Sequence, residues 1–120
     1  QKGKYSQSKL IRVIKGKVVD VVCDLRKSSP SFKKNIFIEL DKNQILFVPK
    51  GIAHGFLSLE DGTILNYKCD KYYNHNSESG FNLFKSNIKL EFSLKYENII
   101  ISDKDNSLPH LDNSYIYENL

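Results

Sequence analysis

The sequence is poor in the residues that most often mark a metal site or a redox centre. Its 120 residues contain two cysteines, three histidines, no tryptophan and no methionine. Cys23 and Cys69 lack the Cys-x-x-Cys spacing of zinc and redox motifs and lie in apolar segments. We therefore expect two buried free thiols in a reduced, cytoplasmic protein. With few histidines and no His-x-His pair, we expect no metal site.

Long apolar runs and familiar catalytic motifs are also missing. No stretch approaches the roughly 20 apolar residues of a membrane-spanning helix, so no membrane association is expected. The opening segment QKGKYSQSKL is charged but lacks the apolar centre of a signal peptide. The absence of Gly-x-Ser-x-Gly, of a phosphate-binding glycine loop and of a histidine–cysteine pair argues against nucleophilic and nucleotide-hydrolysing enzymes.

The net charge of +4 comes from scattered lysines. A nucleic-acid partner is not expected, because no basic stripe with interleaved aromatic residues is present. A few lysines that face a phosphorylated small molecule would explain the charge equally well.

The sequence is rich in short runs in which side chains alternate between two faces. Such runs, separated by turn residues, are typical of an antiparallel β-sandwich or barrel. No segment shows a convincing helical stripe, and 120 residues suffice for one domain. The fold class predicted is therefore all-β, with strands within residues 9–16, 17–25, 35–40, 44–49, 54–60, 63–70 and 88–94.

Two charged residues fall on otherwise apolar faces. Asp20 alternates with Val18 and Val22 on a strand whose other face is also apolar, so we expect it to be buried or to line a cavity. Asp20 could equally well belong to a structural ion pair or be a functional carboxylate. Lys9 begins the strand that carries Ile11 and could reach the same cavity, although an exposed strand-end lysine is the commoner outcome.

Two further residues attract attention for their settings. Tyr67 alternates in step with Leu65 and Cys69 and is predicted to point into the core, where a tyrosine is more often structural than a proton donor. His54 lies in the segment PKGIAHGF, in which a proline and two glycines bracket it. This segment leaves open whether His54 fills a turn or serves a reaction.

Four ordered stretches together resemble one family. They are SQSKLIRVIKGKVVDVVCDLRKSSPSF, LFVPKGIAHGFLSL, NYKCDKYY and ISDKD, and they closely resemble the dTDP-4-dehydrorhamnose 3,5-epimerases over residues 1–112. The resemblance implies an antiparallel, cupin-like jelly-roll barrel that forms a homodimer. Residues 113–120 would then be a C-terminal extension over the surface or over a partner subunit.

The resemblance also implies a reaction. The family acts on a nucleotide-linked 4-keto-6-deoxyhexose without metal or organic cofactor, converting dTDP-4-dehydro-6-deoxyglucose to dTDP-4-dehydrorhamnose. The keto group acidifies the protons on C3 and C5. A base removes a proton, and an acid returns one to the opposite face through an enolate.

By this resemblance, Tyr67 is the acid, Lys9 stabilises the enolate oxygen and Asp20 is a pocket carboxylate beside it. The base is a histidine whose position falls two residues before Gln1. Its aspartate partner corresponds to Asp105.

The remaining positions implied by the resemblance are substrate contacts. His54 corresponds to a pocket histidine, and Tyr72 to an aromatic residue that stacks on the nucleobase. Lys104 corresponds to a phosphate contact, and Gln1 to the last residue of the base's segment.

The sequence departs from the family pattern in ways that leave alternatives open. Because the match begins inside a motif and the chain opens on Gln1, we expect it to be part of a longer protein. Ile52 stands where the family has phenylalanine, and residues 82–92 lack the usual tryptophan. The alternatives are a 3-epimerase or another nucleotide-sugar epimerase, such as a nucleotide-heptose epimerase. A non-catalytic sugar-nucleotide-binding jelly roll would follow if the upstream histidine were absent.

Overall fold

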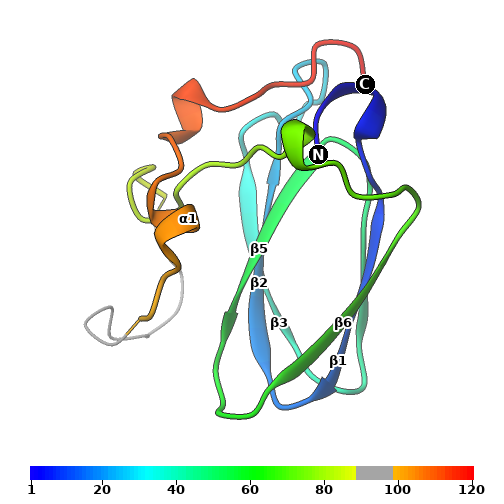
Figure 1. Cartoon of the computed structure of the whole chain (residues 1–120), viewed down its shortest axis with the longest axis vertical. Helices are drawn as coiled ribbons and strands as arrows, with labels where there is room; N and C mark the ends of the chain where they lie inside the picture. Colours follow the sequence, from blue (N-terminus) through cyan, green and yellow to red (C-terminus); the bar gives the residue numbers. More distant parts are fainter. Residues whose placement is uncertain (89–98) are drawn as a thin grey trace. The chain divides into compact units, whose positions relative to one another are not determined.

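The computed structural model describes residues 1–88 and 99–120, and β-strands dominate the described part (Figure 1). Six of the predicted runs are strands, with bounds that agree to within two residues. The seventh run, 88–94, falls outside the described residues apart from residue 88. The strands are β1 (Lys9–Lys15), β2 (Val18–Asp24), β3 (Asn35–Leu40), β4 (Ile45–Val48), β5 (Ile52–Ser58) and β6 (Ile64–Cys69).

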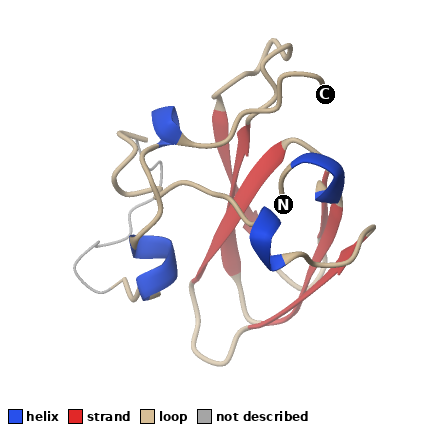
Figure 2. Ribbon diagram, turned by 45° about the horizontal axis from the view of Figure 1, so that its top comes forward, coloured by secondary structure: helices blue, strands red, loops and turns tan. Residues whose placement is uncertain are grey.

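The described chain divides into two compact units. The first comprises Gln1–Glu78 with Ile116–Leu120, and the second comprises Ser79–Tyr115. All six strands belong to the first unit, where Figure 2 shows them in red. They form two three-stranded sheets with the orders β4-β1-β6 and β3-β2-β5. Every strand pairing is antiparallel, so the predicted all-β antiparallel class is confirmed. The predicted domain limits, 1–112 and 113–120, stay a prediction.

The core of the first unit lies between the two sheets. Ile11 from β1, Val18 from β2 and Leu40 from β3 are buried together. As the alternation predicted, the neighbouring β1 residues Leu10 and Ile14 are exposed on the opposite face. Strand β2 is buried along both of its faces, which matches its nearly unbroken run of apolar residues.

The β1–β2 turn depends on Gly16. Its φ is +80°, and a Cβ at this position would lie 2.3 Å from the hydroxyl oxygen of Thr63. Glycine is therefore required twice, for the left-handed backbone and for the close approach of the β5–β6 turn.

In residues 79–88 and 99–115, the second unit has one short helix, α1 (Asp103–Asn106), and the 3₁₀ turn Leu111–Asn113. The Ser102 side chain caps α1 by accepting from the Asp105 N–H. One turn is too short to show an apolar stripe, which explains why the sequence did not predict it. The first unit adds 3₁₀ turns at Gly3–Tyr5 and His75–Ser77. No helix in residues 1–88 or 99–120 is long and apolar enough to span a membrane.

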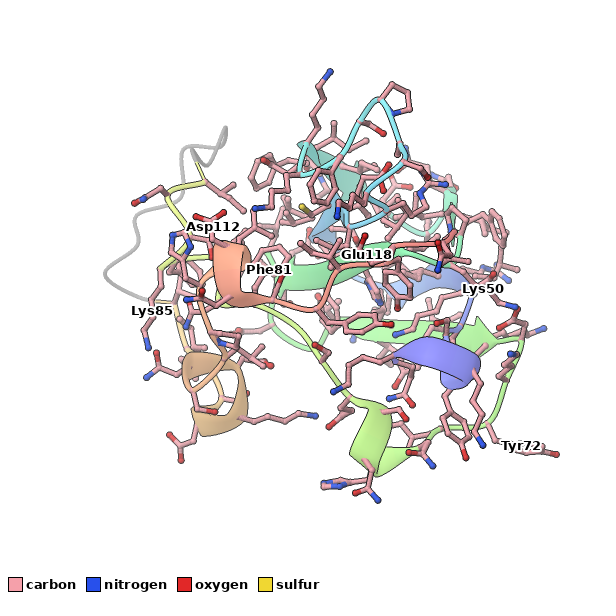
Figure 3. All side chains as sticks on the ribbon, turned by 90° about the horizontal axis from the view of Figure 1, so that it is seen from above. Lys50, Tyr72, Phe81, Lys85, Asp112 and Glu118 are labelled. Atoms are coloured by element: carbon pink, nitrogen blue, oxygen red, sulfur yellow. The ribbon has the colours of Figure 1, made fainter. Side chains whose placement is uncertain are left out.

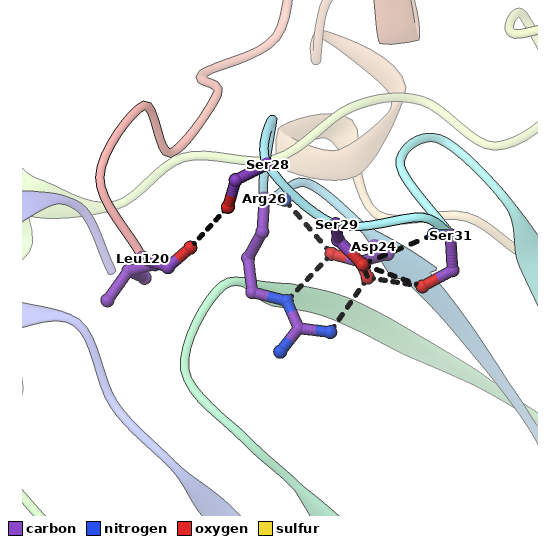
Figure 4. A network of polar contacts seen from close by, with 6 residues as sticks. All are labelled: Asp24, Arg26, Ser28, Ser29, Ser31 and Leu120. Carbon is purple, nitrogen blue, oxygen red and sulfur yellow. Dashed lines mark hydrogen bonds and ion pairs between the residues drawn. The ribbon is translucent and has the colours of Figure 1, made fainter.

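The Asp24 carboxylate anchors the loop that follows β2 (Figure 4). The carboxylate is buried and accepts five hydrogen bonds, from the backbone N–H and the guanidinium of Arg26 and from the hydroxyls of Ser29 and Ser31. The Arg26 pair is bidentate, the strongest geometry for a guanidinium and a carboxylate. This network gives the loop a fixed shape at the end of the sheet.

Asp24 also makes the stability of the fold sensitive to acid. Its pKa lies below the ordinary value of 3.8, first because the Arg26 guanidinium donates to it. The unfolded chain then takes up the proton more readily, so this stabilisation is complete above about pH 4 and is lost as the pH falls below it. Asp24→Asn should lower the free energy of unfolding at pH 7 by about 2–3 kcal/mol and flatten its decline below about pH 4.

Urea titrations between about pH 2 and 7 measure both effects. Asp61→Asn, an exposed carboxylate in the β5–β6 turn, is the matched control and should change stability by less than about 0.5 kcal/mol. An unchanged acid slope in Asp24→Asn would contradict the role of this network.

Candidate functional site

Four polar side chains from four strands face the space between the two sheets. Asp20 shares a face of β2 with Val22, whose cross-strand neighbour on β5 is His54. Lys9 shares a face of β1 with Ile11, whose neighbour on β6 is Tyr67. Since Ile11 and Val18 lie in the core, strand alternation directs all four polar side chains towards the inner side.

Three of these side chains form a continuous polar line from one sheet to the other. Lys9 Nζ lies 3.3 Å from His54 Nε2, and His54 Nδ1 lies 3.4 Å from Asp20 Oδ2. The groups on either side of the ring indicate which nitrogen carries the proton. Nδ1 carries it and faces the carboxylate, and Nε2 accepts from the ammonium. The fourth residue, Tyr67, has its ring centroid 5.9 Å from the same ammonium.

Asp20 is the least satisfied member of this group. Its relative exposure is 0%, and among the described residues neither of its oxygens accepts a hydrogen bond. The nearest polar group there is the His54 ring, whose Nδ1 lies 3.4 Å from Asp20 Oδ2. Burying a carboxylate with so little compensation is costly, and groups that carry such a cost cluster at functional sites.

The turn Pro49–Gly51 sets the start of the strand that carries His54. Gly51 has φ +86°, and a Cβ there would lie 2.4 Å from Arg26 Cγ. The Gly51 carbonyl accepts from the Leu25 N–H at 2.9 Å, which ties the turn to the end of β2. The turn residues therefore bring β5 alongside β2, and the register of these strands places His54 near Asp20.

The burial predicted for Tyr67 is wrong. Its inward direction is as predicted, but the side chain is 57% exposed. The reason is that, among the described strands, β6 lies at the edge of a three-stranded sheet, so a residue beyond Leu65 has described neighbours on one side only. An exposed edge position leaves the phenol accessible from solvent.

The two cysteines behave differently, although both are free thiols. Cys23 is buried as predicted, and burial followed by the nearby Asp24 charge raises the pKa of its thiol to about 11. The predicted burial of Cys69 is wrong, because it lies at the exposed end of β6.

The predicted substrate contacts lie in different parts of the structure and differ in exposure. Gln1 lies next to the loop after β6, where its side-chain oxygen accepts from the Asn74 N–H at 2.9 Å. Tyr72, in the same loop, is 95% exposed and projects away from the ribbon (Figure 3). Lys104 and Asp105 lie on α1 in the second unit, and their roles stay predictions.

Sequence reasoning missed the C-terminal Tyr117, whose hydroxyl donates to the Gln1 carbonyl at 2.5 Å. A tyrosine in a short polar tail gives no signal of such a contact. No group of three histidine, cysteine, aspartate or glutamate side chains within residues 1–88 and 99–120 could hold a metal ion.

Comparison with known proteins matches this chain to one family. A family model described as dTDP-4-dehydrorhamnose 3,5-epimerase matches residues 1–113. A curated protein of that name from Methanothermobacter thermautotrophicus is 39% identical over 114 residues, which cover 92% of this chain and 62% of the relative. The chain thus spans about three fifths of the length of the relatives that it matches.

Solved structures show the same fold. The dTDP-4-dehydrorhamnose 3,5-epimerase from Elizabethkingia anophelis NUHP1 superposes with a TM-score of 0.89 at 36% identity, covering 96% of this chain and 64% of that one. A dTDP-6-deoxy-D-glucose-3,5-epimerase from Legionella pneumophila Philadelphia 1, in complex with dTDP-4-keto-L-rhamnose, gives a TM-score of 0.87 at 29% identity. The superposition covers 98% of this chain and 64% of the Legionella pneumophila chain. The predicted jelly-roll class is confirmed.

The poor compensation of Asp20 predicts a substitution that stabilises the protein. Asp20→Val fits between Val18 and Val22 and removes a buried carboxylate that accepts no hydrogen bond from the described residues, so it should raise the free energy of unfolding by about 1–3 kcal/mol. Urea unfolding at pH 7 measures the change.

The matched control is Asp24→Val, on the same strand. It removes the acceptor of five hydrogen bonds and should lower stability by about 3 kcal/mol or more. Destabilisation by Asp20→Val of the same size would show that Asp20 is a structural residue.

Proposed function

The chain belongs to the dTDP-4-dehydrorhamnose 3,5-epimerase family, and we propose that it forms the jelly-roll portion of an isomerase acting on a nucleotide-linked 4-keto-6-deoxyhexose. The proposed reaction inverts C3 and C5 and converts dTDP-4-dehydro-6-deoxyglucose to dTDP-4-dehydrorhamnose. The observation that carries this proposal is the line from Asp20 through His54 to Lys9, with Tyr67 beside it.

Lys9 supplies the fixed positive charge that the reaction needs. When a base takes the proton from C3 or C5, the electron pair of that C–H bond moves into an enolate and the 4-oxo oxygen becomes negative. A cation held in place before the reaction stabilises this oxygen without reorganisation. His54 Nε2 lies 3.3 Å from the ammonium, and Asp20 Oδ2 lies 3.4 Å from the other ring nitrogen. No metal or organic cofactor takes part in this scheme.

Tyr67 supplies the proton to the opposite face of the sugar. Its phenol transfers the proton to the enolate carbon, and the phenolate that results lies near the Lys9 ammonium. The exposure of the ring at the edge of the sheet allows a bulky sugar nucleotide to approach it.

The other roles follow from the family pattern. The base is a histidine expected two positions before Gln1, with Asp105 as its partner. Tyr72 stacks on the nucleobase, Lys104 contacts phosphate, and Gln1 lies at the sugar. We place the reaction in the cytoplasm, where two free cysteines are stable.

We also propose that the protein is a homodimer. The sheet β4-β1-β6 exposes several large apolar side chains, and cross-strand pairing puts Leu10 next to Phe47. Such a face suits a second copy of the same chain, since closed two-fold pairs are the commonest assemblies. Sedimentation equilibrium should give a dimer for the wild type and a monomer for Phe47→Glu. A monomeric wild type rejects the dimer. The exposed residues are Leu10, Ile14, Ile45, Phe47 and Ile64.

Deuterium incorporation tests the reaction directly. Protein expressed from its complete reading frame is incubated with dTDP-4-dehydro-6-deoxyglucose in deuterated water, and the product is analysed by NMR. Deuterium at both C3 and C5 is the expected result. Deuterium at C3 alone would identify a single-site epimerase. If the sugar nucleotide binds without any exchange, the protein is a binding jelly roll, and the enzymatic proposal fails.

Tyr67→Phe tests the acid separately. Since the base and Lys9 remain, the variant should still exchange protons, while formation of the inverted product should fall by about 10²–10⁴-fold. Tyr5→Phe, which removes a phenol outside the strands, should behave like the wild type. Full epimerisation by Tyr67→Phe would remove Tyr67 from the acid role.

A further inference from the structure

The C-terminal residues Ile116–Leu120, named here the C-terminal strap, run along the loop that follows β2. Arg26 and Tyr117 form a parallel β-bridge. The Tyr117 N–H donates to the Leu25 carbonyl and the Tyr117 carbonyl accepts from the Lys27 N–H, both at 2.9 Å. The backbone of Tyr117 is therefore fixed on both of its sides.

Side chains hold the strap at two further points. Lys27 and Glu118 form an ion pair at 2.8 Å. The Ser28 hydroxyl donates to the Leu120 carbonyl at 2.8 Å, as Figure 4 shows. The loop that receives the strap is itself rigid, because the buried Asp24 carboxylate fixes it.

The strap contacts the predicted substrate residue Gln1 through the Tyr117 hydroxyl. The Tyr117 hydroxyl donates to the backbone carbonyl of Gln1, while the Gln1 side chain accepts from the Asn74 N–H. The next residue, Lys2, donates its N–H to the Ser77 carbonyl at 2.7 Å. Gln1 is thus held by its backbone and by its side chain, from two different segments.

Gln1 also lies beside the loop that follows β6, because its side chain accepts from the Asn74 N–H in that loop. The same loop begins next to Lys9, which is the cross-strand partner of Cys69 at the end of β6. The carbonyl that Tyr117 holds therefore belongs to a segment next to the loop that connects to the strands of Lys9 and Tyr67.

We infer that Tyr117 is a positioning residue, which acts through Gln1 to hold the segment beside the loop after β6 in the geometry that receives the sugar nucleotide. This inference rests on the proposed function. Tyr117 does not touch the reacting atoms, and its hydroxyl contributes by reducing the freedom of residues 1 and 2. Such a contribution acts equally on bound substrate and transition state, so it appears in KM rather than in kcat.

The test compares Tyr117→Phe with the wild type, both expressed from the complete reading frame. Loss of one hydrogen bond to a site residue should raise KM for dTDP-4-dehydro-6-deoxyglucose about five- to tenfold, with kcat changed by less than about twofold. The backbone bonds of residue 117 do not involve the hydroxyl and should persist. Hydrogen exchange of the Lys2 and Asn74 amides should accelerate, because the segment that they hold is less ordered.

Two controls separate positioning from general stability. Ser28→Ala removes a strap bond without touching Gln1, and Tyr5→Phe removes a phenol that is not the donor to the Gln1 carbonyl. Both should keep the wild-type KM and the wild-type exchange of these two amides. A rise in KM of the same size in Ser28→Ala would assign the effect to the strap as a whole and overturn the specific role of the Tyr117 hydroxyl.

The two proposals fail in different ways. Wild-type KM and exchange rates in Tyr117→Phe overturn the positioning role and leave the epimerase proposal intact. If the wild type shows no epimerisation, the proposed function fails and the substrate role of Tyr117 fails with it. Amide exchange would then still report whether the hydroxyl orders residues 1 and 2.

Discussion

The buried charge of Asp20 is the constraint on which the site depends. A carboxylate in the middle of β2 has no water to solvate it, and the two sheets offer it little compensation. The His54 ring on the neighbouring strand faces this carboxylate, and the nearest positive charge, the Lys9 ammonium on the opposite sheet, lies on the far side of the imidazole. The need to compensate one buried charge therefore links β1, β2 and β5 across a core that is otherwise apolar.

Asp20 and Asp24 lie on one strand but have very different environments. The two carboxylates lie four residues apart and are both buried. Asp24 accepts five hydrogen bonds and shapes a loop, whereas Asp20 faces a single histidine. The first arrangement serves stability, whereas the second leaves a carboxylate incompletely satisfied, as the proposed substrate site requires.

The strands could be predicted from the sequence because alternation and turn chemistry are local. The inward direction of Lys9, Asp20 and Tyr67 followed from the same alternation. Their contacts could not be predicted, since the register that sets His54 beside Asp20 depends on pairing between distant strands. The exposure of Tyr67 could not be predicted either, because the sequence does not show which strand lies at the edge of a sheet. The contact between Tyr117 and Gln1 spans the whole chain and has no local signature.

The position of Tyr67 on an edge strand has a consequence for the catalytic cycle. A phenol that has given its proton to a sugar must recover one before the next turnover. A sequestered acid would need a relay of side chains for this, whereas the ring of Tyr67 is exposed among the described residues. If the complete protein keeps this exposure, the proposed acid recovers its proton from the solvent, and the hydrogen that the product carries away comes from water.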